Sequence, residues 1–286
     1  MKRPLELMES EKTLSTLLVL TSAFEGIASF HLAKIRSEVL RSNAFFNDLW
    51  QIYSKIRVDK LFHFGRSQSE VKVSEKGLFI VITAEGGFSG DVDLRIINKM
   101  MESYNANKHE VIVVGQHGVT LLEQRGVKLK KYYDLPAKDM NMNVTPLVSD
   151  VQDYQQTTVF YSRYITLGNQ TIESITLSSL VQEMGQEVKV NEEVISDVNY
   201  IFEPSNYAVI DHLEKSMLFI SLSQLILGSK LAQYASRFSS MTLARQNAED
   251  SKTHVHMELR RAVRALNDER SKETINSLRK SRVTSL

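Results

Sequence analysis

The stretch "ASRFSSMTLARQNAEDSK", residues 235–252, decides the fold expected for this chain. It contains neither glycine nor proline, and the same composition continues through residues 253–282. Glycine and proline are the residues that most often interrupt a helix, so this run predicts one helix that extends almost to the last residue.

Apolar residues repeat along this part of the chain with the spacing of a coiled coil. Thirteen of sixteen positions reached from Leu213 in steps of four and three are apolar or tyrosine. A repeat over so many heptads predicts a coiled coil. At 1.5 Å per residue, a helix over residues 207–282 would be roughly 110 Å long and would extend beyond a compact domain. The positions are Leu213, Met217, Ile220, Gln224, Leu227, Leu231, Tyr234, Phe238, Met241, Arg245, Ala248, Lys252, Val255, Leu259, Ala262 and Leu266.

The first 60 residues carry a second stripe of apolar residues and are expected to form the partner helix. Two long helices that leave one compact domain can pair antiparallel. An ordinary helical bundle is the alternative, but roughly 140 residues of different character separate the two helices, whereas bundle loops are short. The C-terminal helix is the longer, and Ile275, Leu278 and Val283 near its end require cover from another protein. The N-terminal stripe is Leu17, Leu20, Phe24, Ile27, Leu32, Ile35, Val39, Phe46, Leu49, Tyr53 and Ile56.

Residues 68–205 hold most of the glycines and prolines and are expected to form an α/β domain. Residues 77–104 read as strand, glycine turn and amphipathic helix, and residues 111–114 as a second strand. Residues 157–167 and 170–177 are expected to form a hairpin, and residues 198–202 a short fifth strand. Together they predict a Rossmann-like domain with a five-stranded, mostly parallel sheet. The expected division is therefore 1–60 helix, 68–205 α/β domain and 206–286 helix.

Composition excludes several functions. The net charge is +1 in 286 residues, which argues against a general nucleic-acid or membrane-surface binder. The absence of cysteine excludes disulfides, thiolate metal sites and a cysteine nucleophile. Acids at positions 6, 9 and 11 argue against a signal peptide. The most apolar stretch, residues 217–227, is about half the length needed to span a bilayer, so no direct membrane insertion is expected.

The glycine turn at residues 85–93 invites a nucleotide-binding hypothesis that its residues do not support. Gly86, Gly87 and Gly90 match neither the dinucleotide fingerprint nor a P-loop. The acids at 85, 91 and 93 would repel phosphate at a helix N-terminus. They could hold a hard cation, but solvated carboxylates are the commoner explanation.

The remaining candidates for chemistry are weak. His109 and His117 have no recognisable acidic partner in the sequence, and His254 and His256 lie on different faces of a helix. No catalytic, cofactor-binding or metal-binding residue is therefore predicted.

Several stretches resemble the gamma subunits of F-type rotary ATP synthases. The most specific is "YIFEPS", residues 200–205, which in that family leads into the long C-terminal helix. "VITAEGGFSG", residues 81–90, and "GQHG", residues 115–118, are similar to the family's glycine turn and to the segment that follows its next strand. The resemblance covers nearly the whole chain in the right order. Matching positions include Tyr200, Phe202, Glu203, Pro204, Arg237, Met241, Asn247, Gly87 and Gly90.

The resemblance implies a central rotor shaft that couples ion translocation to ATP synthesis or hydrolysis. In the family the two terminal helices form a coiled coil inside a ring of three alpha and three beta subunits. The α/β domain lies at the foot, against an epsilon-type subunit and the membrane ring. Nucleotides bind the ring, which implies a non-catalytic subunit without a cofactor. The implied location is peripheral, on the inner face of an energy-transducing membrane, either bacterial or mitochondrial.

Charged and apolar residues near the end of the C-terminal helix are the candidate rotor–stator contacts, although charge runs are also typical of a solvated helix face. They are Glu258, Arg260, Arg261, Arg264, Asn267, Asp268, Arg270, Ile275 and Leu278.

Several positions depart from the family pattern. His31 takes the place of a lysine, Gln233 that of a glutamate, and Ser271 that of a glutamine. These departures leave open a specialised rotary ATPase that does not synthesise ATP. A non-rotating coiled-coil scaffold and a Rossmann-like enzyme are the further alternatives.

Overall fold

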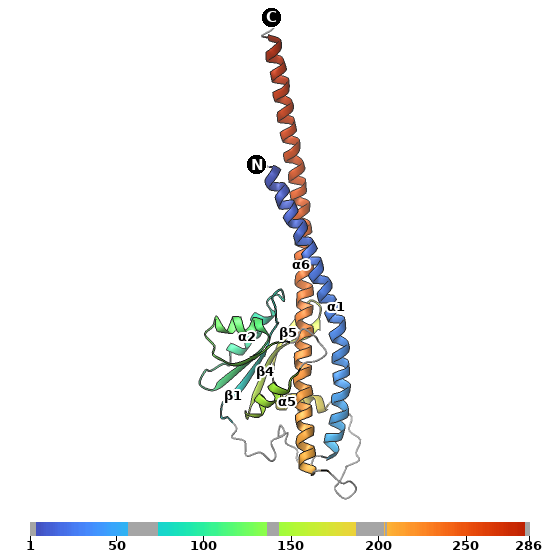
Figure 1. The fold of residues 1–286 in the computed structure, drawn as a ribbon, viewed down its shortest axis with the longest axis vertical. Helices are drawn as coiled ribbons and strands as arrows, with labels where there is room; N and C mark the ends of the chain where they lie inside the picture. Colours follow the sequence, from blue (N-terminus) through green and yellow to red (C-terminus); the bar gives the residue numbers. More distant parts are fainter. Residues whose placement is uncertain (1–3, 57–73, 136–142, 187–202, 204, 284–286) are drawn as a thin grey trace. The chain divides into compact units, whose positions relative to one another are not determined.

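The computed structural model describes residues 4–56, 74–135, 143–186, 203 and 205–283. The chain separates into two compact units, one formed by Met1–Ile27 with Ser239–Leu286 and the other by Ala28–Phe238. We call them the terminal unit and the α/β unit. Two long helices contribute to both: α1, Pro4–Ile56, and α6, Asn206–Val283 (Figure 1). The division at residues 60, 68 and 205 stays a prediction.

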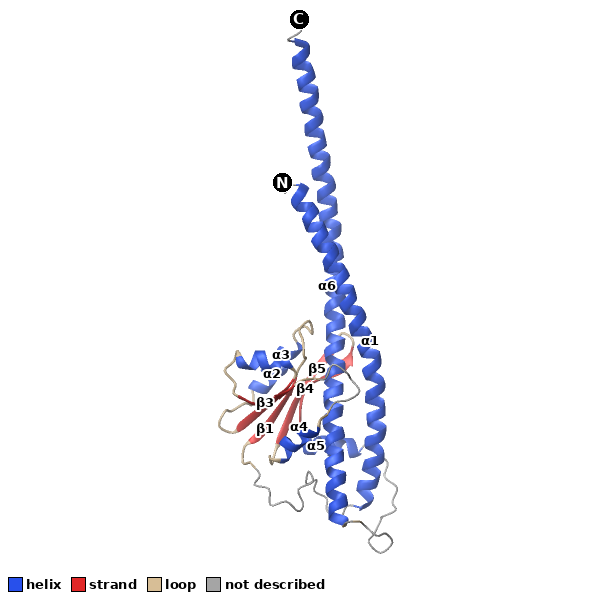
Figure 2. Cartoon of the chain, in the orientation of Figure 1, coloured by secondary structure: helices blue, strands red, loops and turns tan. Residues whose placement is uncertain are grey.

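The α/β unit contains a five-stranded, mostly parallel sheet, as predicted. Its strand order is β3-β2-β1-β4-β5, and only β4 and β5 pair antiparallel (Figure 2). The predicted hairpin is confirmed, since β4 and β5 flank Gly168. The strands are β1 Gly77–Ile82, β2 His109–Val114, β3 Leu129–Tyr133, β4 Thr157–Thr166 and β5 Asn169–Thr176.

The edge strand β3 was not predicted. Its sequence, LKKYY, has no clear alternation and three of its five residues are exposed, so it lacks the apolar signal of a buried strand. Residues 198–202, the expected fifth strand, lie outside the described residues.

Helices cover both faces of this sheet. One face, with Phe79 and Val81, packs against α2, Val92–Met101, and α3, Gln116–Glu123. The other packs against α4, Thr145–Gln152, α5, Leu177–Gln186, and the parts of α1 and α6 within this unit. Because both faces are covered, β1 and β2 are nearly continuous apolar runs.

In the terminal unit, α6 presents its predicted heptad face to α1. The seven heptad positions from Arg245 to Leu266 are all buried or half-buried. Most residues between them are exposed, for example Asn247, Met257 and Val263. The coiled-coil spacing read from the sequence is therefore confirmed for this part of α6.

The expected stripe on the first half of α1 is wrong at three of its four positions; the fourth, Phe24, is half-buried. Leu17, Leu20 and Ile27 are 43–50% exposed, whereas Thr21 and Glu25 are buried or half-buried. The face that is buried instead is mixed: Leu7 and Ala28 are buried and Leu14 and Leu18 are half-buried, together with Thr21 and Glu25. In the α/β unit the predicted residues Ile35, Phe46 and Tyr53 are buried as expected.

One stretch of α1 is long and apolar enough to cross a membrane by length and composition, with mean hydropathy 1.4, and only 11% of it is buried. Its exposed apolar residues require cover of some kind. Glu25 within α1 is bound by Thr242 and Arg245 of α6.

Candidate functional site

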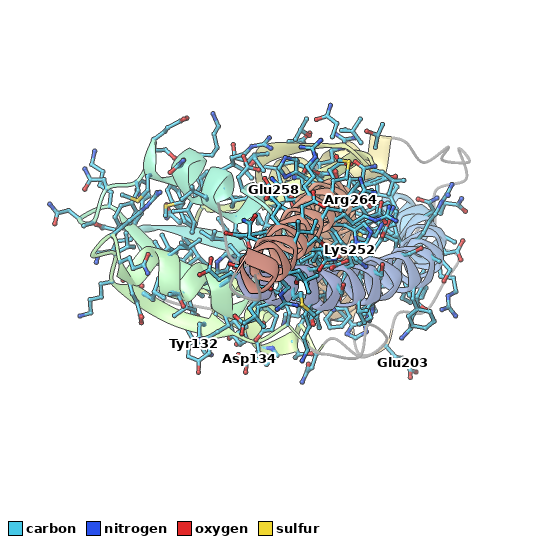
Figure 3. The ribbon with its side chains drawn as sticks, turned by 90° about the horizontal axis from the view of Figure 1, so that it is seen from above. Tyr132, Asp134, Glu203, Lys252, Glu258 and Arg264 are labelled. Atoms are coloured by element: carbon cyan, nitrogen blue, oxygen red, sulfur yellow. The ribbon has the colours of Figure 1, made fainter. Side chains whose placement is uncertain are left out.

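The candidate contact residues of α6 lie on an open surface. Arg260, Arg261, Arg264, Asn267, Asp268, Arg270, Ile275 and Leu278 are exposed, and Glu258 is half-buried. Figure 3 labels Lys252, Glu258 and Arg264 on this helix. The structure therefore leaves these side chains accessible; their role in contacts stays a prediction.

Exposed apolar side chains occur on both helices of the terminal unit. Leu5 is 74% exposed and Val19 70% exposed, and Ile275 and Leu278 are 51% and 60% exposed. Large exposed apolar side chains are candidates for contact with another protein or with a membrane. We call this set the apolar flank: Leu5, Met8, Leu17, Val19, Leu20, Ile27, Leu243, Met257, Val263, Ile275 and Leu278.

A polar cluster fixes the pairing of α1 and α6 in the terminal unit. Glu25 accepts hydrogen bonds from Arg245 Nε at 3.0 Å and Thr242 Oγ1 at 2.8 Å. Arg245 also pairs with Glu249 at 2.8 Å. The hydrogen bond to Glu25, with the charge of Glu249, raises the pKa of Arg245. A polar pair at a helix–helix seam specifies register, because any slip separates the two charges.

Replacing Glu25 by alanine is expected to weaken this pairing and to remove its salt dependence. Helix–helix stability of the wild-type chain should fall as added salt screens the Glu25–Arg245 pair. A double-mutant cycle of Glu25→Ala with Arg245→Ala, followed by thermal unfolding, measures the coupling. Glu9→Ala, at an exposed acid of the same helix, is the control. Equal salt dependence in the wild type and Glu25→Ala would contradict the assignment.

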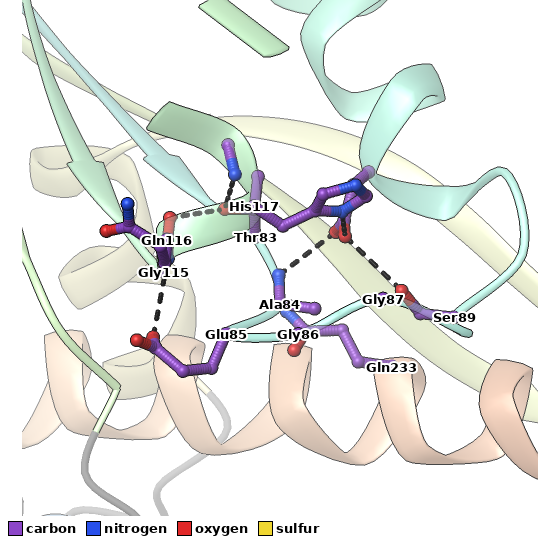
Figure 4. A network of polar contacts seen from close by, with 12 residues as sticks. Thr83, Ala84, Glu85, Gly86, Gly87, Ser89, Gly115, Gln116, His117 and Gln233 are labelled. Carbon is purple, nitrogen blue, oxygen red and sulfur yellow. Dashed lines mark hydrogen bonds and ion pairs between the residues drawn. The ribbon is translucent and has the colours of Figure 1, made fainter. Parts of the chain in front are cut away.

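Asp93 is the centre of a buried polar network at the glycine turn. Its carboxylate accepts from the Ala84 backbone N–H at 3.1 Å and the Ser89 hydroxyl at 3.3 Å, and lies 2.7 Å from His117 Nδ1 (Figure 4). The side chain is 1% exposed. The expectation that Asp93 is solvated is therefore wrong, as is the expectation that His117 has no acidic partner.

The GQHG segment packs against the end of β1 with no room for side chains at its glycines. Gly115 has φ of 105°, and a Cβ there would lie 2.2 Å from the Thr83 carbonyl oxygen. A Cβ at Gly118 would lie 2.4 Å from Thr83 Oγ1. The close approach lets Thr83 Oγ1 accept from the Gly118 N–H at 3.0 Å. Both glycines are thus required by packing.

Arg237 and Ser236 of α6 hold the glycine turn from the other side. Arg237 Nη2 donates to the carbonyls of Gly86 and Gly87, each at 3.1 Å. Ser236 Oγ donates to the Ser89 carbonyl at 2.7 Å. The motif residues Gly87 and Arg237 therefore meet. The left-handed positions of this turn are Phe88, with φ of 70°, and Gly90, with φ of 65°, rather than Gly87.

The chain's own carboxylates occupy the places where a phosphate would bind an α/β fold. Glu85 Oε2 accepts from the backbone N–H of Gln116, at the start of α3, and of Leu135. Asp93 occupies the first turn of α2 and binds the end of β1. A phosphate approaching either helix N-terminus would meet a negative charge already hydrogen-bonded there.

The other predicted motif residues separate into three groups. Met241 is 7% exposed and belongs to the helix seam, whereas Asn247 and Glu203 are exposed. Tyr200, Phe202 and Pro204 lie outside the described residues. Among the described residues, no three histidine, aspartate or glutamate side chains are grouped so that they could hold a metal ion.

Comparison with known proteins gives one consistent family. A family model described as ATP synthase matches residues 11–265. The ATP synthase gamma chain of Clostridium novyi (strain NT) is 23% identical over 254 residues, which are 84% of this chain and 84% of the relative. That of Mycoplasmopsis pulmonis (strain UAB CTIP) is 26% identical over 246 residues, 81% of this chain and 82% of the relative.

Solved structures share the fold. A chain from the rotor of Euglena gracilis mitochondrial ATP synthase superposes with a TM-score of 0.60 at 14% identity, covering 91% of this chain and 98% of that one. A chain from the central stalk and c-ring structure of Tetrahymena thermophila mitochondrial ATP synthase gives 0.55 at 16% identity, covering 79% and 99%. Because the family model matches residues 11–265, which are most of this chain, the chain belongs to the ATP synthase family. The relatives named above are gamma chains of that family.

Proposed function

We propose that this chain is the central rotor shaft of an F-type ATP synthase or ATPase. The carrying observation is the apolar flank, which is exposed on a helix pair whose own seam is partly polar. A ring of alpha and beta subunits around the terminal unit would cover that flank. An apolar contact of this kind depends on packing rather than on directional bonds, so it permits rotation.

The shaft would act by biasing conformations of the ring. Each angle of an asymmetric helix pair favours a different conformation of each surrounding subunit. The charged residues near the end of α6, among them Arg260, Arg264 and Arg270, would set preferred angles. The α/β unit would form the foot, against an epsilon-type subunit and the membrane ring, which gives a peripheral location on the inner face of the membrane.

The chain itself would catalyse no step and bind no nucleotide. The supporting observation is that Glu85 accepts a hydrogen bond at the start of α3 and Asp93 lies in the first turn of α2. Nucleotides would bind the ring subunits, and the shaft would stimulate the hydrolysis of ATP by the ring.

Affinity purification of the tagged chain from its source tests this proposal. Three alpha and three beta subunits per chain are expected, with ATPase activity in the complex and none in the lone polypeptide. Val19→Glu is expected to weaken association with the ring more than tenfold, because it buries a charge in an apolar contact. Ser22→Glu, at an exposed polar position of the same helix, is the matched control.

Two outcomes would contradict the proposal. Robust hydrolysis by the lone chain would indicate an enzyme, and absence of ring subunits would indicate a scaffold. A complex that hydrolyses ATP but never synthesises it would identify the specialised rotary ATPase.

A further inference from the structure

An apolar groove in the α/β unit has no place in the proposed rotor function. It is lined by residues of α1, α4 and α6 and has a volume of about 550 Å³. Its walls include Phe45 and Leu49 of α1, Val148 of α4, and Phe219 and Ile220 of α6. This volume is within the range of small-molecule sites, which are typically a few hundred to about 1,000 Å³.

The groove carries positive charge at one side only. His212 and Lys215 of α6 line it, three residues apart and hence on one face of the helix. Among the residues that the structure describes, no carboxylate lines the groove. The other polar groups in its lining are neutral side chains of α4 and α6, such as Ser149. A ligand therefore needs a long apolar part and an anionic end.

Two acids near these residues are engaged elsewhere. Glu214 is buried and accepts a hydrogen bond from the Tyr53 hydroxyl at 2.9 Å. Asp150 pairs with Lys131 at 3.2 Å and accepts from the Tyr133 hydroxyl. Neither carboxylate lines the groove, and Lys215 is an exposed lining residue, so its charge can reach a ligand's carboxylate.

From this complementarity we propose that the groove binds a free, single-chain fatty acid. The alkyl chain lies against Phe45, Leu49, Val148 and Phe219, and the carboxylate pairs with Lys215. A straight chain suits a groove between helices because it needs contact along its length and one charge at its end. The proposal is independent of the rotor function.

The only tryptophan of the chain provides the readout. Trp50 is the next residue after groove-lining Leu49, packs against Phe46 and is 9% exposed. A bromine atom on a bound alkyl chain would quench the fluorescence of Trp50 by contact. Titration of the full chain with 10-bromodecanoate should therefore give saturable quenching.

A chain-length and head-group series tests the chemistry. Competition by octanoate, decanoate and dodecanoate should strengthen about fourfold per buried CH₂ group. Decanoate should compete better than decanol, and decyltrimethylammonium should not compete. Lys215→Gln should weaken decanoate at least fivefold and leave decanol unchanged, a difference that misfolding would not produce. Ser149→Phe, at an exposed groove position, should block all quenching while far-ultraviolet circular dichroism stays unchanged.

Three results would overturn the proposal. Quenching that does not saturate would indicate nonspecific binding or a groove already filled by another part of the chain. Equal affinity for decanoate and decanol, in wild type and Lys215→Gln, would remove the role of the charge. Binding to phosphatidylglycerol vesicles without binding of monomeric decanoate would indicate a membrane surface instead.

Discussion

Replacing Gly115 by alanine is expected to lower the free energy of unfolding of the α/β unit by about 4 kcal/mol. A backbone conformation open almost only to glycine contributes about 1–3 kcal/mol of this loss. The rest, about 1–3 kcal/mol, comes from overpacking, because the added Cβ would lie 2.2 Å from the Thr83 carbonyl oxygen. This oxygen belongs to the backbone, so relieving the overlap requires the main chain to shift. Urea unfolding followed by Trp50 fluorescence measures the loss.

Two other glycines separate the two causes of this effect. Gly126 has φ of 72° but nothing within 4 Å of an added Cβ, so Gly126→Ala should cost only about 1–2 kcal/mol of strain. Gly228 lies within α6 with open space and an ordinary φ. Gly228→Ala should therefore stabilise the unit by up to about 1 kcal/mol. A loss below about 1 kcal/mol for Gly115→Ala would contradict the described packing of α3 on β1.

Asp93→Ala is expected to cost about 3 kcal/mol, the second large effect. The substitution leaves the buried Ala84 N–H and the Ser89 hydroxyl without their acceptor, and His117 without its carboxylate. Asp93→Asn should cost less, since its amide oxygen can still accept from Ala84. The same urea titration checks both variants.

Asp91→Ala is the matched control for Asp93. Asp91 lies two residues earlier, and its side chain is 69% exposed and makes no capping hydrogen bond. Its removal should change stability by less than about 0.5 kcal/mol. Similar losses for Asp91→Ala and Asp93→Ala would contradict a buried network and would indicate a general charge effect at the turn.

The long C-terminal helix could be predicted because its signal is local and redundant. The seven heptad positions from Arg245 to Leu266 are spaced in steps of four and three, as in a helix–helix seam. All seven are buried or half-buried. On α1 the same reasoning selected Leu17, Leu20 and Ile27, which lie outside the seam. The buried and half-buried positions Leu14, Leu18, Thr21, Glu25 and Ala28 follow the same spacing of three and four. Periodicity therefore offers two stripes on α1, and only the contact of Glu25 with Arg245, 220 residues away in sequence, shows which one meets α6.

The polar network at the glycine turn was beyond sequence reasoning for a similar reason. Asp93 and His117 are 24 residues apart, and only the parallel pairing of β1 with β2 brings them together. The turn itself was recognised from its glycines, but an acid beside a glycine turn is more often solvated than buried. The Gly115 and Gly118 spacing was the available signal, because two glycines after a strand often mark a close backbone approach.

Rotation of the chain inside the ring is the central claim, and observation of single complexes tests it most directly. The native chain has no cysteine, so Lys108→Cys, at an exposed position of the α/β unit, can carry a single bead while the ring is fixed to a surface. We expect ATP-driven rotation in one direction, with pauses that follow the threefold symmetry of the ring. Steady ATP hydrolysis by complexes whose beads stay fixed, or only fluctuate about one angle, would contradict it.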